Sequence, residues 1–413
     1  MTLTRTGPAA AAAGSRRLGL AALCVTVIVS YGVIYYAFPV LSSSITAATG
    51  WSRAAVTTAY SAGNLTGAIA GIPAGRLLHR YGPRPVMTAG SVLGAVAVAG
   101  IAAAPAYGWF VAAWLAAGLA TAGLFYPPAF AALTAWYAER RVQALTALTL
   151  TAGFASTIFA PLTSTLAAHL SWRATYLVLG AVLALLTIPA HALALRVPWT
   201  AHSGQSPRPV RDRQILTSRA FLQLAAAATL CALVQYAALV NVVPLLEGRG
   251  VSPGLAAWAL GLGGAGQVAG RLGYRQLASR LSIRARAAAV IGAVAASTLL
   301  LGLLPGPVTV LVAASVVAGA ARGVFTLTEA TIVSDYWGPE RYAVLNGVFN
   351  APVVAAGAIA PAVGAGIAAT VGSYPALYTI LTAIGLAGAV LAAASPAPAS
   401  ASSAGDLDRH GSR

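Results

Sequence analysis

The chain has 413 residues, of which 8% are charged and 58% hydrophobic, whereas a soluble protein carries about 25% charged residues. The composition therefore excludes a water-soluble globular protein. The net charge of +17 comes from 25 arginines and no lysine against eight acids, a balance that in a soluble chain would indicate nucleic-acid binding. Because a membrane-spanning helix uses roughly 20 apolar residues, the sequence has room for about a dozen spans and indicates a polytopic membrane protein.

The first apolar run, Leu18 to Gly50, follows Arg16 and Arg17 and contains no charged residue. It is much longer than the apolar region of a cleaved signal peptide, so we expect an uncleaved first span. The only two cysteines, Cys24 and Cys231, lie within apolar runs and have no neighbouring metal-binding or redox motif. We therefore expect neither a disulfide framework nor a metal site.

Apolar runs bounded by charge, glycine or proline predict twelve spans, so the expected fold class is an all-α membrane protein. The six spans of the first half are 19–46, 54–76, 86–104, 108–136, 143–167 and 174–195. The six spans of the second half are 220–246, 254–279, 287–304, 308–334, 343–370 and 374–394. The expected divisions are an N-terminal tail (1–18), a first half (19–195), a polar linker (196–219), a second half (220–394) and a disordered Ala/Ser/Pro tail (395–413).

Arginine placement predicts the orientation of these spans. If the N-terminus lies in the cytoplasm, 20 arginines fall on the cytoplasmic side and three, Arg53, Arg173 and Arg249, fall in external loops. This asymmetry is a strong positive-inside signal. We therefore expect both termini in the cytoplasm of a multi-pass protein in the plasma (inner) membrane, and arginines that contact anionic lipid and bind no nucleic acid.

The two halves are copies of each other at an ungapped offset of 200 residues. The offset aligns Arg80 with Arg280 and Arg84 with Arg284, and further along it aligns Gly123 with Gly323, Arg141 with Arg341 and Pro161 with Pro361. An even number of spans separates the copies, so they have the same orientation. Two parallel six-helix repeats with a central site near mid-membrane are typical of transporters that work by alternating access.

The segment GRLLHRYGPR, between the second and third expected spans, resembles the signature motif of the major facilitator superfamily. Gly75, Arg80, Gly82 and Arg84 match that motif, whereas His79 replaces its usual acid. The second-half copy is weaker but keeps Arg280 and is followed by Arg284. The resemblance implies that these residues gate the cytoplasmic side, and the alternative is that their arginines only anchor the topology.

Three further segments resemble the monocarboxylate and oxalate/formate branch of that superfamily, namely ATGWSRAAVTTAY, LSWRATY and GSYPALY. The glycine- and proline-rich antiporter motif of drug exporters is poorly matched in the fifth span. The resemblance implies transport of a small monocarboxylate-like anion. In that branch an arginine of the eighth helix binds the substrate carboxylate, and Arg271 is the matching position. The branch has an acid four residues earlier, where this chain has Gln267.

Three charged residues lie near the middle of the membrane in the predicted spans, where a charge is costly and normally faces a cavity or a partner. Arg271 lies nine residues before Arg280, about 13 Å further into the membrane along a helix. Arg322 lies near the middle of the tenth span, and Glu329 follows two turns later. Arginines match carboxylates, and Glu329 is the best intramembrane group to carry a proton. The alternative is that Arg322 and Glu329 form a structural pair.

Polar and aromatic residues near the middle of other spans are further candidates for lining the central site. They are Tyr35, Tyr36, Asn64, Tyr126, Gln235, Tyr236, Asn241 and Gln267, together with the neighbouring Tyr31.

Enzymes and sensors are the rival classes. The sequence contains no catalytic, phosphate-binding or nucleotide-binding motif, and its linker is short for a soluble output region. We expect a monomeric secondary transporter without a cofactor, moving a small organic anion together with a proton. The alternative is an exporter of a hydrophobic or zwitterionic compound.

Overall fold

The computed structural model describes residues 8–137, 140–199, 214–338 and 341–397, and helices account for nearly all of them. No strand occurs within these ranges. The predicted all-α fold is therefore confirmed. Most of the expected linker and tail lies outside the described residues.

The first half contains six helical spans, four of which are interrupted. Its elements are α1 (Pro8–Ser30), η1 (Tyr31–Tyr36), α2 (Ala37–Thr49), α3 (Arg53–Tyr81), α4 (Pro83–Ala102), α5 (Tyr107–Leu124), α6 (Tyr126–Tyr137), α7 (Arg141–Ala152), α8 (Ala155–His169), α9 (Trp172–Pro189) and η3 (Ala190–Ala194). The π-helical segments η1 and η3 continue α1 and α9. The fourth and fifth spans break between α5 and α6 and between α7 and α8.

The second half contains six uninterrupted spans. They are α11 (Arg219–Glu247), α12 (Pro253–Arg280), α13 (Ile283–Leu303), α14 (Val308–Trp337), α15 (Tyr342–Val371) and α16 (Tyr374–Ala393). Ten helices of the described chain are long and apolar enough to cross a membrane. The two spans outside that set, α3 and α12, contain more glycine and polar residues and occupy equivalent places in the two halves.

The sequence repeat is visible in the packing of the two halves. Helices α3 and α12 start at residues 53 and 253, and α4 and α13 start at 83 and 283. Within each half, two glycines allow two helices to touch through their backbones. A Cβ atom on Gly118 would lie 1.8 Å from the carbonyl oxygen of Gly63, and one on Gly319 would lie 1.9 Å from that of Gly263. The pairs α3–α5 and α12–α14 are thus packed in the same way.

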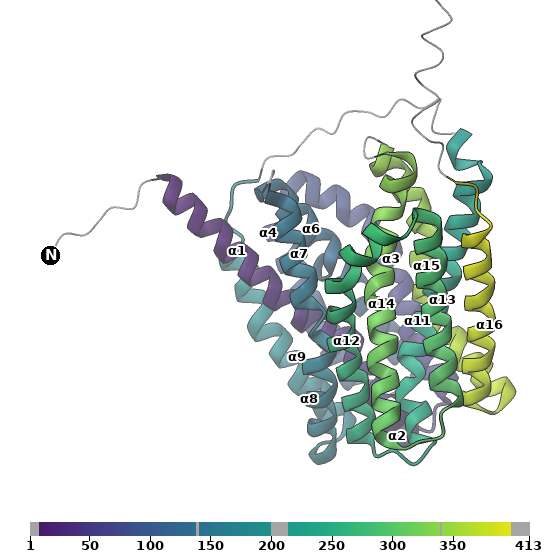
Figure 1. Cartoon of the computed structure of the whole chain (residues 1–413). Coiled ribbons are helices and arrows are strands. Elements are labelled where there is room, and N and C mark those ends of the chain that lie inside the picture. The colour runs from purple at the N-terminus through teal and green to yellow at the C-terminus, as the bar shows by residue number, and fades with distance from the viewer. Residues whose placement is uncertain (1–7, 138–139, 200–213, 339–340, 398–413) are drawn as a thin grey trace, which may run out of the picture.

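The two halves lie side by side and diverge toward one end of the molecule (Figure 1). We call the end that carries Pro8 and Ala393 the near face, and the opposite end, which carries the turn after α2, the far face. Helix α3 packs against α15, and α8 packs against α12. At these two seams Ala362 N donates to Ser61 Oγ at 2.9 Å, and Thr157 Oγ1 donates to the carbonyl oxygen of Gly261 at 2.8 Å.

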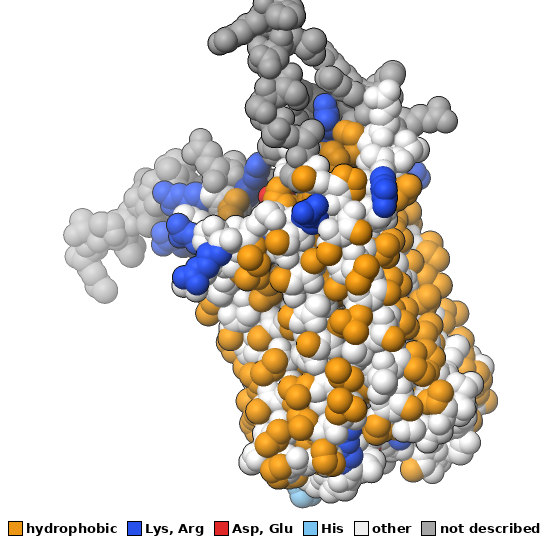
Figure 2. Space-filling model, turned by 45° about the vertical axis from the view of Figure 1, so that its right-hand side comes forward, with side chains coloured by type: hydrophobic (Ala, Val, Ile, Leu, Met, Phe, Trp, Pro, Cys, Tyr) orange, Lys and Arg blue, Asp and Glu red, His pale blue; other side chains and the backbone are white. Residues whose placement is uncertain are grey.

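The flank of the molecule is apolar, as a lipid-facing surface must be. Figure 2 shows hydrophobic side chains spread over the flank and arginines gathered mainly toward the near face. Large apolar side chains that point outward include Leu185, Val96 and Val390, which are 74%, 64% and 66% exposed. Because apolar patches of this extent are rare on soluble monomers, the surface fits a bilayer.

Candidate functional site

A cluster of tyrosines lies where the two halves meet. The π-helical segment η1 supplies Tyr31, Tyr35 and Tyr36, because a π-helical turn holds more residues than an α-helical one and turns them toward a common side. The ring of Tyr35 lies 6.4 Å from that of Tyr236 in α11, which belongs to the other half. The ring of Tyr31 lies 5.0 Å from that of Tyr126 at the start of α6. The hydroxyl of Tyr35 is buried and has no hydrogen-bond partner within the described residues.

Arg271 reaches from α12 into the first half. Its side chain is buried, with the residue 7% exposed, and its Nη1 donates a hydrogen bond to the carbonyl oxygen of Thr149 in α7. The guanidinium also lies beside the Tyr126 side chain. Its Nε has no hydrogen-bond partner among the residues that the structure describes. Part of the donor set of Arg271 is therefore unused.

Arg322 is buried inside the second half. The residue is 8% exposed, and its Nε has no hydrogen-bond partner in the described part of the chain. It lines a cavity of about 40 Å³ between α11, α12, α13 and α14. A cavity of this size holds one or two water molecules. Tyr35 and Tyr236 lie near the Arg322 guanidinium, so Arg322 also approaches the tyrosine cluster.

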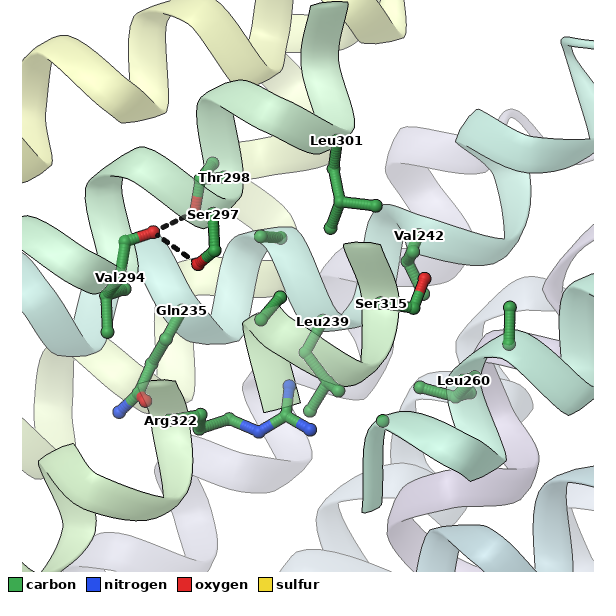
Figure 3. A pocket seen from close by; sticks show the side chains of 14 residues that line it. Gln235, Leu239, Val242, Leu260, Val294, Ser297, Thr298, Leu301, Ser315 and Arg322 are labelled. Carbon is green, nitrogen blue, oxygen red and sulfur yellow. Dashed lines mark hydrogen bonds between the residues drawn. The ribbon is translucent and has the colours of Figure 1, made fainter. Parts of the chain in front are cut away.

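Figure 3 shows how this small cavity is lined. The amide of Gln235 lies at the same end as the Arg322 guanidinium, and its Oε1 has no partner among the described residues. The hydroxyls of Ser297 and Thr298 donate to the carbonyl oxygen of Val294 at 3.0 and 2.8 Å. Their oxygen atoms remain available as acceptors toward the cavity.

Glu329 lies in α14, two turns beyond Arg322. It is not paired with Arg322, since the ion pair found among the described residues joins Arg286 to Asp335. Instead it lies near Tyr236 and Cys231 of α11. The structure thus does not contain the structural pair that the sequence left open as an alternative.

The remaining candidates for lining the site divide into two groups. Asn64 lies beside Tyr60, close to the tyrosine cluster. Tyr36 packs edge-to-face on Tyr35 at 5.2 Å. In contrast, Asn241 Nδ2 donates to the carbonyl of Ala237 at 2.9 Å in its own helix. Gln267 is buried, and its backbone packs against Gly323 of α14.

On the near face, the first half contains an open cavity of about 730 Å³. Helices α3, α5 and α6 line most of it, and the lining residues include Gly71, Gly75, Leu78, Ala122, Arg141 and Trp199. All the lining residues belong to the first half or to the segment that follows it. The described second half therefore contributes no residue to the lining of this cavity.

The predicted gating residues of the first half make contacts within that half. Gly82 has a positive φ of 79°, which favours glycine, and it forms the tight turn between α3 and α4. Arg84 Nε donates to the carbonyl of Ala192 in η3 at 2.9 Å. The guanidinium of Arg80 lies 5.1 Å from the ring centre of Tyr81. Trp199 Nε1 donates to the carbonyl of His79 at 3.1 Å and covers Gly82.

The corresponding residues of the second half also stay within their own half. Arg280 ends α12, and Arg284 Nη1 donates to the carbonyl of Ser395 at 3.4 Å. In this conformation, the hydrogen bonds and ring contacts found for the predicted gating residues in the described chain therefore do not connect the two halves. This arrangement agrees with the divergence of the halves at the near face.

Sequence reasoning missed a polar cluster on the far face. Ser43 Oγ donates to Glu247 Oε2 at 2.6 Å, and Arg53 Nη2 donates to Ser43 Oγ at 3.1 Å. Ser43 and Arg53 belong to the first half and Glu247 to the second. One sequence signal was present, because Glu247 is the only acid between Arg213 and Glu329.

Comparison with known proteins identifies the family of this chain. The sequence profile described as Major Facilitator Superfamily matches residues 23–314, which is more than half of the chain. No curated protein matches the chain significantly.

Among solved structures, the chain is similar to a bacterial homolog of the human lysosomal transporter Spinster. The inward-facing and unoccupied form of that protein has a TM-score of 0.67 at 18% sequence identity and covers 94% of this chain and 96% of its own. The inward-facing and occupied form has a TM-score of 0.64 at 17% identity and covers 91% and 94% of the two chains. At this level of identity the likeness concerns the fold.

The fold and its polar interior are those of a membrane transport protein. The chain belongs to the Major Facilitator Superfamily. It is therefore a multi-pass membrane protein that acts on a small-molecule substrate and catalyses no chemical reaction.

Proposed function

We propose that this protein is a secondary active transporter that moves a small, monocarboxylate-like organic anion by alternating access, coupled to protons. One observation carries the proposal. Arg271 and Arg322 are both buried, and neither forms an ion pair with an acid among the described residues.

The physical reason is the cost of an unbalanced charge in a low-dielectric interior. A buried cation without a partner is strongly destabilising. Each guanidinium has an Nε donor without a partner in the described chain, and a guanidinium matches a carboxylate in geometry and charge. A substrate carboxylate would supply the charge and the hydrogen-bond acceptors that these arginines lack.

The tyrosine cluster supports the same substrate class. Tyr35 has a buried hydroxyl without a partner in the described residues, and Tyr126 lies beside Arg271. Tyrosine hydroxyls can donate to an anion, and their rings exclude water from the site. We propose that the substrate contacts come from Arg271, Arg322, Tyr35, Tyr36, Asn64, Tyr126, Gln235, Tyr236 and Gln267. Asn241, which bonds to its own helix, is the weakest of the original candidates.

Glu329 is our proposed proton carrier. Within the described ranges the other two acids have partners, since Glu247 accepts from Ser43 and Asp335 pairs with Arg286. Glu329 has no ion-pair partner in those ranges and lies on the helix that carries Arg322. A proton on Glu329 would balance the charge of the site when an anion enters or leaves.

The proposal includes the topology that the arginines predict. Both termini lie in the cytoplasm, so the near face is cytoplasmic and this conformation opens inward. The protein functions as a monomer in the plasma (inner) membrane. Arg80, Arg84, Arg280 and Arg284, with Gly75 and Gly82, close the near face when the protein opens outward.

A thermal-shift screen of small carboxylic acids on the purified protein tests the substrate class. We expect at least one monocarboxylate to raise the melting temperature of the wild type and to lose this effect in Arg271→Gln. Stabilisation by neutral or cationic compounds only would contradict the proposal.

Export of a zwitterionic compound is the second candidate. The separation of Arg322 from the unpaired Glu329 favours this function. Seven residues of helix span about 10 Å, so Arg322 can bind the negative group of a zwitterion while Glu329 binds its positive group. Stabilisation by amino-acid-like zwitterions, lost in both Arg322→Gln and Glu329→Gln, would select this function over the first.

A further inference from the structure

Three arginines lie on the far face, and two of them are satisfied within their own half. Arg173 Nη1 donates to the carbonyl of Ala102 at 2.8 Å and its guanidinium lies over the ring of Trp172. Arg249 donates to the carbonyls of Leu301 and Gly302 at 2.7 and 2.6 Å. Each of these two arginines therefore connects neighbouring helices of one half.

Arg53 is bonded differently. Its Nη2 donates to Ser43 Oγ at 3.1 Å, and its guanidinium lies 6.0 Å from the ring centre of Tyr374 in the other half. Its Nη1 is buried and has no hydrogen-bond partner within the described residues. Arg53 therefore combines a fixed position with a donor that its own half does not use.

The side chain that completes this cluster is a carboxylate from the other half. Glu247 Oε2 accepts a hydrogen bond of 2.6 Å from Ser43. Glu247 and Arg53 form no direct ion pair, because the described ion pair of the structure is Arg286–Asp335. Ser43 thus stands between the guanidinium and the carboxylate, accepting from one and donating to the other.

The first half contributes only donors to the carboxylate of Glu247. A serine hydroxyl and a nearby guanidinium with a free N–H are a donor set that suits an anion, and a carboxylate above all. Glu247 is held by its own helix, so it occupies this donor set only while the halves touch at the far face.

We propose that Ser43 and Arg53 form a binding site for carboxylate anions on the far face, and that Glu247 occupies this site as a built-in carboxylate in the present conformation. When the halves separate at the far face, Glu247 moves away with the second half. A carboxylate from solution then takes its place and delays the return of Glu247. The ligand class rests on the proposed function, whereas the site itself rests on the cluster described here.

The consequence is competition between two carboxylates for one site. An anion in solution binds only the form in which the far face is open, so it shifts the population toward that form by mass action. Removing the charge of Glu247 weakens the internal competitor. Removing the charge of Arg53 weakens the site for both.

The experiment measures the separation of the far face directly in the full chain. Spin labels are attached to cysteines at Ala48 in α2 and Ala369 in α15, which are exposed positions on opposite halves, after Cys24→Ala and Cys231→Ala. Pulsed electron spin resonance in lipid nanodiscs then gives the ratio of open to closed far faces. Sodium acetate is the probe, and sodium chloride at equal ionic strength is its comparison.

We expect acetate to raise the open-to-closed ratio more than chloride does. Glu247→Gln should raise the ratio about five- to tenfold without any added anion, because a charged hydrogen bond is replaced by a neutral one. The same variant should respond to a lower concentration of acetate than the wild type. Arg53→Gln should lose the difference between acetate and chloride.

Arg173→Gln is the matched control, because it removes one far-face arginine whose bonds stay within one half. It should keep the wild-type response to acetate. Loss of the response in both variants would assign the effect to surface charge and overturn the proposal. An unchanged response in Arg53→Gln would overturn it as well.

A second background separates this proposal from the proposed function. In Arg271→Gln/Arg322→Gln the central arginines are gone, so an acetate response that persists must arise at the far face, even if the transported substrate is not an anion. A response that vanishes there, while the wild type responds, overturns the far-face site and leaves the central one. If this double variant does not purify as a folded protein, the comparison of Arg53→Gln with Arg173→Gln decides alone.

Discussion

Arg271 and Thr149 belong to opposite halves of the molecule, and the Arg271 guanidinium donates a hydrogen bond to the Thr149 carbonyl. Thr149 lies in α7, just before the break at Gly153 that separates α7 from α8. Arg271, which we propose to bind the substrate, therefore also connects the two halves. A carboxylate bound to the remaining donors of Arg271 would be held by a side chain that also contacts the other half, so substrate binding and the relative position of the halves are linked.

Arg271→Gln should lower the affinity for a substrate carboxylate by roughly 2–5 kcal/mol, because the charge partner of the carboxylate is lost. Arg271→Lys should recover only part of this energy, since an ammonium group lacks the planar fork of a guanidinium. Calorimetry with a carboxylate identified in the thermal-shift screen measures both. Equal affinity in the wild type and in Arg271→Gln would remove Arg271 from the site.

Glu329→Gln should abolish accumulation driven by a pH gradient, because an amide cannot take up a proton and release it again. It should still allow exchange of substrate across the membrane, because the amide resembles the protonated carboxyl group of Glu329 in charge and shape. Uptake into proteoliposomes, with and without a pH gradient and with substrate on one or both sides, measures the two modes. Persistent pH-driven accumulation in this variant would place the coupling group elsewhere.

Arg80→Ala should slow transport while leaving substrate affinity largely intact. In the present conformation the Arg80 guanidinium contacts Tyr81 of its own half, and we propose that it helps to close the near face in the opposite conformation. Loss of a contact made in one state alone shifts the balance between states. The turnover rate at matched expression measures the effect, and an unchanged rate would leave Arg80 as a topology anchor.

Gly118→Ala and Gly319→Ala should each destabilise the protein by about 1–3 kcal/mol, since overpacking forces closely packed backbones apart. The added Cβ atom would lie 1.8 Å from Gly63 O in the first variant and 1.9 Å from Gly263 O in the second. Gly292→Ala is the control, because no atom lies within 4 Å of its added Cβ. The melting temperatures of the three variants should separate the first two from the third.

The proposed orientation has a direct test in intact cells. Gly14→Cys on the near face and Ala48→Cys on the far face are exposed positions, and each is introduced after Cys24→Ala and Cys231→Ala. A membrane-impermeant thiol reagent should label Ala48→Cys and not Gly14→Cys. The reverse pattern would invert the topology.

Apolar runs and the 200-residue offset predicted the helices and the repeat, because both depend on the order of residues along the chain. The glycine pairs Gly63–Gly118 and Gly263–Gly319 show why the repeat persists in the packing. The break of the fifth span was harder to predict. It falls at Gly153 and Phe154. It does not fall at Pro161, which lies inside α8 although proline is a common helix breaker.

The site was less predictable, because it depends on how each helix is rotated about its axis. Asn241 stays a predicted lining residue, and the sequence did not show that its Nδ2 bonds to the carbonyl of Ala237 in its own helix. Gln235 lines the small cavity within the second half. Glu247 stood at the end of a predicted span, where an acid is unremarkable, and its contact with Ser43 joins residues 204 positions apart. Contacts of that range follow from the tertiary packing and from no local pattern.

The backbone contact between α3 and α5 and its counterpart between α12 and α14 give each half a packed interior of its own. If each half also folds on its own, the peptide link between them mainly keeps them in the same place at the same time. Two separate polypeptides, divided within residues 200–213 and produced together, should then find each other in the membrane and restore function. Such a pair would let one half be altered or labelled while the other is left untouched.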